Sequence, residues 1–116
     1  MIEKTTIWAL MKDFVYAGIK CIIMRTAAYE TNNAQTWERV GTAVLEYVKD
    51  LVALRYLHDV KVVCNDTVNT EETIKANEFH LKFGWQVLED GEWAYTDFDL
   101  MPGGGMVISD ESEGDM

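Results

Sequence analysis

The residues that could do chemistry are few in this sequence, and they lie far apart. His58 and His80 fall in different predicted elements, and Cys21 and Cys64 lack the C-x-x-C spacing of a zinc or redox site. The sequence contains no glycine-rich phosphate loop, no GxSxG elbow and no HExxH motif. It therefore predicts no catalytic residue, no metal site and no cofactor, so we expect a protein that is not an enzyme.

The single histidines and cysteines have ordinary structural interpretations. His58 opens a predicted strand and His80 lies on the polar face of another, so both are expected at the surface. Cys21 and Cys64 each lie within a short apolar run, which predicts buried thiols on core strands.

Carboxylates are concentrated near the C-terminus, at Asp110, Glu111, Glu113 and Asp115. This segment is expected to be too mobile to hold a catalytic geometry, and its spacing does not match a calcium loop. The group is therefore interpreted as a charged tail.

Charge is distributed very unevenly along the chain. Residues 1–82 contain all 10 basic residues and 11 of the 20 acidic ones, whereas residues 83–116 contain the other 9 acids and no base. Contacts with nucleic-acid phosphates need cations, so direct nucleic-acid binding by this end is disfavoured. An acidic end instead indicates solubility, a basic protein partner or mimicry of nucleic acid.

The length of 116 residues and the hydrophobic fraction of 48% predict one folded domain. The apolar runs are too short to cross a membrane, and the first residues do not resemble a signal peptide. Cytosolic residence is therefore the default expectation.

Hydrophobic periodicity predicts two helices and a short strand in the first half of the chain. Apolar residues recur with a helical period and then form a continuous run, and an asparagine at position 32 or 33 could cap the next helix. The predicted elements are a helix over 3–17 stopped by Gly18, a strand over 19–25 and a long helix over 34–57.

The second half predicts strands joined by turns. Asn69 and Glu72 have the spacing of a capping box for a short helix, and Asp90-Gly91 is a typical hairpin turn. Alternation places Phe79, Leu81, Phe83 and Trp85 on one strand face, opposite His80 and Lys82. The predicted elements are a strand over 58–65, a turn over 66–70, a helix over 71–78 and a hairpin from 79 to 101.

The order α-β-α-β-α-β-β predicts an α/β fold. We expect a mixed sheet of about four strands, partly parallel, covered by two long helices and one short helix. Pro102-Gly103-Gly104-Gly105 then separates a domain of residues 1–101 from a flexible acidic arm of residues 102–116. Within this arm, residues 106–109 form a strand-like patch with no evident local partner.

The stretch from Asp59 to Phe79 carries the most specific pattern in the chain. It resembles the signature of contractile phage tail sheath proteins, D-[FY]-x-V-x-C-D-x-T-N-N-T-P-E-x-I-D-x-N-x-[FL], although Glu71 replaces the usual proline. The resemblance extends over about residues 5–88. The positions interpreted as matching are Asp59, Val62, Cys64, Asp66, Thr67, Asn69, Thr70, Glu72, Ile74, Asn77 and Phe79.

The resemblance is to the C-terminal domain of these proteins, which are several times longer. It implies a stand-alone domain or a minimal relative of the family, located in the virion tail and assembled in the host cytoplasm. In that family the domain surrounds the tail tube, and arms from neighbouring subunits complete its sheet by β-augmentation. Met106, Val107, Ile108 and Ser109 have the length and composition of such an arm.

The implied partners are further copies of the chain or other tail subunits, such as tube and sheath, with no direct nucleic acid and no membrane. The role could be that of a sheath, a sheath initiator, a cap or a connector. The alternative hypothesis is an acidic inhibitor, or nucleic-acid mimic, that binds a basic host protein.

Overall fold

The computed structural model describes residues 3–27 and 30–111 of the chain. Three helices and four strands follow one another along the sequence. They are α1 (Lys4–Ala27), α2 (Ala34–Ala53), β1 (Asp59–Val63), α3 (Glu71–Lys75), β2 (Phe79–Gln86), β3 (Trp93–Leu100) and β4 (Met106–Glu111).

Helix α1 is continuous over 24 residues, so the predicted strand over residues 19–25 is wrong. Gly18 does not stop the helix. It lies against Tyr47 of α2, whose hydroxyl occupies the space that a β-carbon at residue 18 would need. The helix is apolar around most of its circumference, which makes its last turns look like a buried strand in sequence. In the helix Ile19 and Ile23 are buried, but Cys21 is exposed, contrary to the prediction of a buried thiol.

Helix α2 begins where the sequence predicts and ends earlier. Asn33 caps it, because its side-chain oxygen accepts a hydrogen bond from the Thr36 amide at 3.1 Å. Four residues shorter than predicted, the helix ends at Ala53, and Arg55 then adopts a left-handed backbone with φ of 65°.

The four strands form one sheet in the order β1-β2-β3-β4, and every neighbouring pair is antiparallel. The α/β class, the two long and one short helices and the number of four strands are confirmed, although the fourth strand is residues 106–111 in place of residues 19–25. The expected parallel pairing is wrong. That expectation depended on a strand before α2 that would need a helical crossover, and those residues belong to α1.

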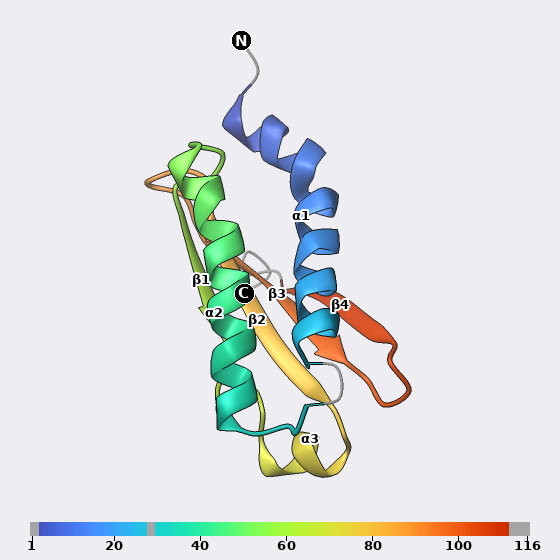
Figure 1. Ribbon diagram of the computed structural model, residues 1–116. Helices are drawn as coiled ribbons and strands as arrows, with labels where there is room; N and C mark the ends of the chain where they lie inside the picture. Colours follow the sequence, from blue (N-terminus) through green and yellow to red (C-terminus); the bar gives the residue numbers. More distant parts are fainter. Residues whose placement is uncertain (1–2, 28–29, 112–116) are drawn as a thin grey trace.

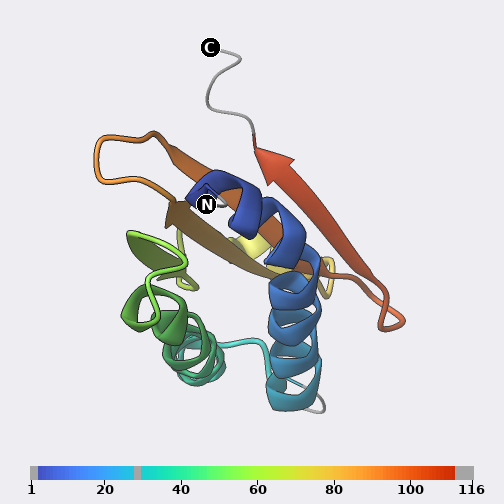
Figure 2. The ribbon, with the colours of Figure 1, turned by 90° about the horizontal axis from the view of Figure 1, so that it is seen from above.

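Both long helices cover the same face of the sheet (Figure 1), and the view in Figure 2 shows the other face free of helices. The alternation predicted for β2 is confirmed, since Phe79, Leu81, Phe83 and Trp85 are all buried. His80 and Lys82 lie on the opposite, half-exposed face. The domain is therefore two-layered, with its core between the helices and one sheet face.

An aromatic cluster joins α1 to the middle of the sheet. The Trp8 and Trp85 ring centroids are 5.6 Å apart, and Tyr16 meets Phe98 edge-on at 5.4 Å. The ring centroids of Phe83 and Trp85 are 5.4 Å apart, and Phe83 completes the cluster. Such pairs contribute about 0.5–1.5 kcal/mol each beyond their buried area. This cluster fixes which side of α1 faces the sheet.

A pair of substitutions tests whether residues 19–25 are helical or extended. An extended run would place Cys21 and Ile23 on the same face, whereas the helix buries Ile23 and exposes Cys21. We expect Ile23→Ala to lower the free energy of unfolding by about 2–4 kcal/mol because it leaves a cavity. The matched control Cys21→Ala should change it by less than about 0.5 kcal/mol. Equal losses in denaturant titrations would contradict the helix.

Candidate functional site

Strand β4 completes the sheet of its own chain. Residues 106–111 pair antiparallel with β3 through six residue pairs, from Leu100 with Met106 to Tyr95 with Glu111. The expectation that this patch has no local partner is therefore wrong, since the ladder available on β3 could not be read from the sequence. Ser112, Glu113 and Asp115 of the predicted acidic tail lie outside the described residues.

The side chains of β4 are only weakly buried. Met106 is half-buried and every other residue of the strand is exposed, including Val107 at 49% and Ile108 at 38%. The strand follows a glycine-rich turn in which Gly103 and Gly104 have φ values of 91° and 93°, which favour glycine. Main-chain pairing therefore supplies most of the attachment of β4, and the sheet ends in an exposed edge.

Asp110 adds a side-chain anchor between β4, β3 and α1. Its Oδ1 accepts hydrogen bonds from the Thr96 hydroxyl at 2.7 Å and from the Tyr16 hydroxyl at 2.9 Å. Lys12 Nζ lies 3.4 Å from its Oδ2. Thr96 is fully buried and is the polar residue on the otherwise apolar inward face of β3. The first helix and the last strand are thus joined by charge-assisted hydrogen bonds.

These contacts lower the pKa of Asp110. Partial burial alone would raise the pKa, but the hydrogen bonds from Thr96 and Tyr16 and the charge of Lys12 outweigh it. Burial raises the pKa of the Tyr16 hydroxyl, so that this group remains a donor. Little in the sequence indicates this anchor beyond a threonine at an inward position of a strand.

The residues of the predicted motif gather mainly at the corner between β1 and β2. This corner comprises the end of β1, the turn over residues 64–70, α3 and the start of β2 (Figure 1). Asp59 lies at the other end of β1, where its carboxylate accepts from the Val60 amide at 2.8 Å. Asp66 of the family pattern does not hold the turn. Asn65 does, because its Oδ1 accepts from the amide and the hydroxyl of Thr67 at 2.9 and 2.5 Å.

Asn69 joins the corner to β2 and does not cap α3. Its Oδ1 accepts from the His80 amide at 2.8 Å, and its Nδ2 donates to the His80 carbonyl at 2.9 Å. The side chain is buried, so it replaces a strand partner where β1 has ended. The capping box of α3 is formed by Thr70 and Thr73, one residue after the predicted Asn69 and Glu72.

The other matching residues have structural positions in the same corner. Phe79 is buried and Ile74 packs against the core, while Glu72 is exposed in the first turn of α3. Asn77 has φ of 59°, a conformation that asparagine tolerates better than most residues. Val62 is half-buried on β1.

Cys64 meets the prediction of a buried thiol on a strand only in part, because it directly follows β1 and is half-buried. The thiol is partly buried, and burial raises its pKa to about 12, against the opposing effect of a hydrogen bond with Asn69. A thiol with this pKa remains protonated near neutral pH and is a poor nucleophile.

The outer face of the sheet pairs basic residues of β2 with acidic neighbours. His80 lies between two carboxylates, with Nδ1 2.5 Å from Asp99 and Nε2 2.9 Å from Glu78. Lys82 lies 3.2 Å from Glu111 of β4. His58 is exposed, as predicted. The acids of the last two strands therefore lie beside the basic side chains His80 and Lys82 of β2.

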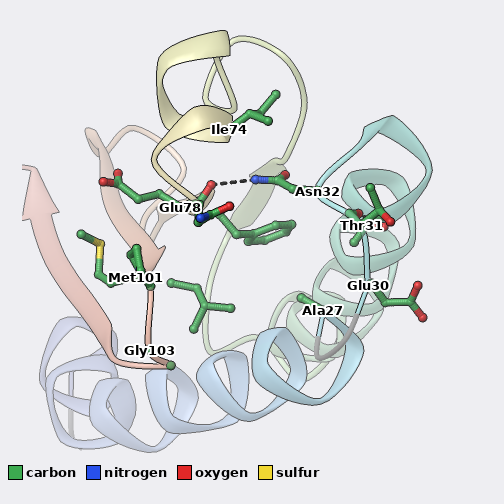
Figure 3. A pocket seen from close by; sticks show the side chains of 14 residues that line it. Ala27, Glu30, Thr31, Asn32, Ile74, Glu78, Met101 and Gly103 are labelled. Carbon is green, nitrogen blue, oxygen red and sulfur yellow. Dashed lines mark hydrogen bonds between the residues drawn. The ribbon is translucent and has the colours of Figure 1, made fainter.

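An open hollow of about 610 Å³ lies where the α1–α2 connection, α3 and the β3–β4 turn meet. In Figure 3, Asn32 crosses its edge and donates to the Glu78 carbonyl at 2.8 Å. The carboxylates of Glu30 and Glu78 are engaged elsewhere, with Arg39 and His80. The hollow therefore offers contact area and does not bring two acids together for catalysis.

Metal-binding clusters and membrane-spanning helices are both absent from the residues that the structure describes. Among residues 3–27 and 30–111, no three His, Cys, Asp or Glu side chains cluster closely enough to hold a metal ion. Within the same ranges, neither long helix has a stretch both long and apolar enough to cross a membrane.

Comparison with known proteins gives one match. The family model for the phage tail sheath C-terminal domain matches residues 10–100, well over half of the chain. The chain belongs to this family. No curated protein and no solved structure is matched. The matched residues of this sheath C-terminal domain run from α1 to the end of β3, so β4 follows them.

Membership makes this sheath domain a structural component of a phage tail. The family is structural and not enzymatic, and its domains assemble with other tail subunits. The corner therefore has the features of a rigid scaffold element, built from side-chain to main-chain hydrogen bonds around Asn65 and Asn69.

Two alanine substitutions separate the roles of neighbouring corner residues. Asn69→Ala leaves the amide and carbonyl of His80 without their partner in a buried site, so we expect a loss of about 2–3 kcal/mol in unfolding free energy. Thr70→Ala removes an exposed helix cap and should cost about 1 kcal/mol. Equal denaturant midpoints for the two variants would show that Asn69 does not tie the corner to β2.

Asp110→Asn tests the side-chain anchor of β4. The pKa of Asp110 is lower in the folded state than its ordinary value of 3.8. The contribution of Asp110 to the free energy of unfolding is therefore present at pH above 3.8 and is lost as the pH falls through the lower folded-state pKa. We expect Asp110→Asn to speed amide hydrogen exchange in β4 at neutral pH and to remove the acid-induced change seen in the unmodified chain. Glu111→Gln, on the adjacent residue, is the control and should keep that pH dependence. An unchanged exchange rate in Asp110→Asn would exclude the anchor.

Proposed function

We propose that this tail domain assembles with neighbouring subunits by exchanging β4. In the separate chain β4 pairs with its own β3, and in the assembly it would pair with β3 of a neighbour in the same register. Residues 102–116 then act as the arm expected from the sequence, with Met106, Val107, Ile108 and Ser109 as its first paired residues. The partners are further copies or other sheath and tube subunits of the virion tail, joined during assembly in the host cytoplasm.

The position and exposure of β4 carry this proposal. The strand lies at the sheet edge, most of its side chains are exposed, and it follows a glycine-rich turn. Little side-chain packing must therefore be lost when β4 leaves its own sheet, and an identical ladder is regained on the neighbour. The Asp110 anchor can re-form with Tyr16 and Thr96 of the acceptor subunit.

The charge pattern favours this function over an acidic inhibitor or nucleic-acid mimic. A mimic needs carboxylates presented to a basic groove. Here Asp110 lies beside Lys12, and Glu111 beside Lys82. Asp99 likewise lies beside His80. These acids contribute to holding the sheet together.

A disulfide that locks β4 to its own β3 tests the exchange. Asp97 and Ser109 are directly opposite each other in the ladder, so Asp97→Cys with Ser109→Cys can be oxidised in the monomer, in a Cys21→Ser background. We expect the oxidised protein to fold but to fail to form assemblies with tail subunits, and reduction to restore assembly. Light scattering and electron microscopy report the assembly state.

The control lock joins β2 to β3, which do not separate in the exchange. Gln86→Cys with Trp93→Cys bridges directly opposite residues of that hairpin, in the same Cys21→Ser background. This oxidised control should assemble normally. Normal assembly of the oxidised β3–β4 lock would show that β4 is not exchanged.

A further inference from the structure

Helix α1 carries a second apolar face on the side away from the core. Its buried residues face the sheet and α2, yet Leu10 is 72% exposed, Phe14 is 81% exposed and Met24 is 38% exposed. Ala17 and Cys21 are exposed on the same side. This set of five residues is called the α1 stripe below. Exposed apolar groups of this size on a folded domain mark interaction sites.

The spacing of the α1 stripe identifies the shape of its partner. The five positions are separated by four, three, four and three residues, which is the heptad repeat of a helix–helix seam. At about 100° per residue they fall within an arc of about 80°. A flat or irregular partner surface does not require this alternation, whereas knobs-into-holes packing against another helix does. The occupant that fits the α1 stripe is therefore a helix.

We propose that the α1 stripe pairs with the α1 stripe of a second copy in antiparallel orientation. In that register Leu10 faces Cys21 of the second copy, and Phe14 faces Ala17. The largest side chain of the stripe thus meets its smallest, twice per dimer, as close packing requires. The interface is isologous, because the two-fold axis makes both halves identical.

Charges beside the stripe support the same orientation. Asp13 and Lys20 are exposed and occupy equivalent flanking positions, one residue before Phe14 and Cys21. In the antiparallel register Asp13 of each copy meets Lys20 of the other, which gives two opposite-charge pairs. In a parallel dimer the same flank of the two helices lies on opposite sides of the seam, so Asp13 and Lys20 of the two copies would not pair. Both side chains lie on the flank of the stripe away from Gly18, where α2 packs.

This dimer is independent of β4 exchange. The α1 stripe lies on the exposed side of α1, opposite its buried residues, whereas β4 is attached to β3 at one edge of the sheet. The two contacts can therefore be abolished separately, and the failure of either one leaves the other testable.

Cross-linking through the natural Cys21 tests the orientation. On one helix residues 10 and 21 are about 16 Å apart, too far for a bond within a chain, so a disulfide between them must join two copies. We expect oxidised Leu10→Cys to give a covalent dimer in non-reducing electrophoresis, and adding Cys21→Ser to abolish it. Met24→Cys, which faces Ile7 of the second copy, should give no covalent dimer. Spontaneous Cys21–Cys21 dimers of the unmodified chain would instead indicate the parallel arrangement and overturn the proposal.

Charge reversal and sedimentation test the interface without cysteines. Asp13→Lys should weaken the dimer roughly tenfold or more, since two attractive pairs become repulsive. The double variant Asp13→Lys/Lys20→Asp should restore it. Phe14→Ser should give a monomer that circular dichroism shows to be folded. The control Leu54→Ser replaces another exposed apolar residue, 66% exposed and directly after the end of α2, and should remain dimeric. A monomeric unmodified chain, including one whose α1 stripe binds a tube subunit instead, would overturn the proposal.

Discussion

The aromatic contact between α1 and the sheet sets the geometry of the whole domain. Trp8 and Tyr16 pack against Trp85 and Phe98, and these rings can meet only when one side of α1 faces the sheet. The same contact brings the Tyr16 hydroxyl to Thr96. These two hydroxyls then donate hydrogen bonds to Asp110 of β4. It also turns the opposite side of α1 outward. The attachment of β4 and the exposure of the α1 stripe therefore have one cause.

The elements that sequence predicted well are those with a single periodic signal. Helix α2 has a clear apolar stripe and an asparagine cap, and β2 alternates between buried and half-exposed residues except at the buried Gly84. The last turns of α1 resemble a strand in sequence because they are apolar on two faces. One face contacts the core, and the other is the α1 stripe. A helix with two apolar faces has no clear period, so its sequence matches that of a buried strand equally well.

The candidate site was predictable in part. The family pattern located the corner, but the capping box of α3 begins at Thr70 and not at the expected Asn69, since turn geometry is set by backbone angles that spacing alone does not fix. The role of Asn69 depends on His80, eleven residues away, and that of Asp110 on Tyr16 at the other end of the chain. Such long-range partners follow from the packed fold and are not visible in a local motif.

The turn before β4 limits the distance that this strand can travel. From Met101 to Met106 the chain takes five residue steps, which even fully extended span roughly 17 Å. A sheet that receives β4 must therefore present the end of its own β3 within that radius of the donor. Subunit spacing in any strand-linked array is then set by the number of residues between the two strands, and a longer turn would relax it.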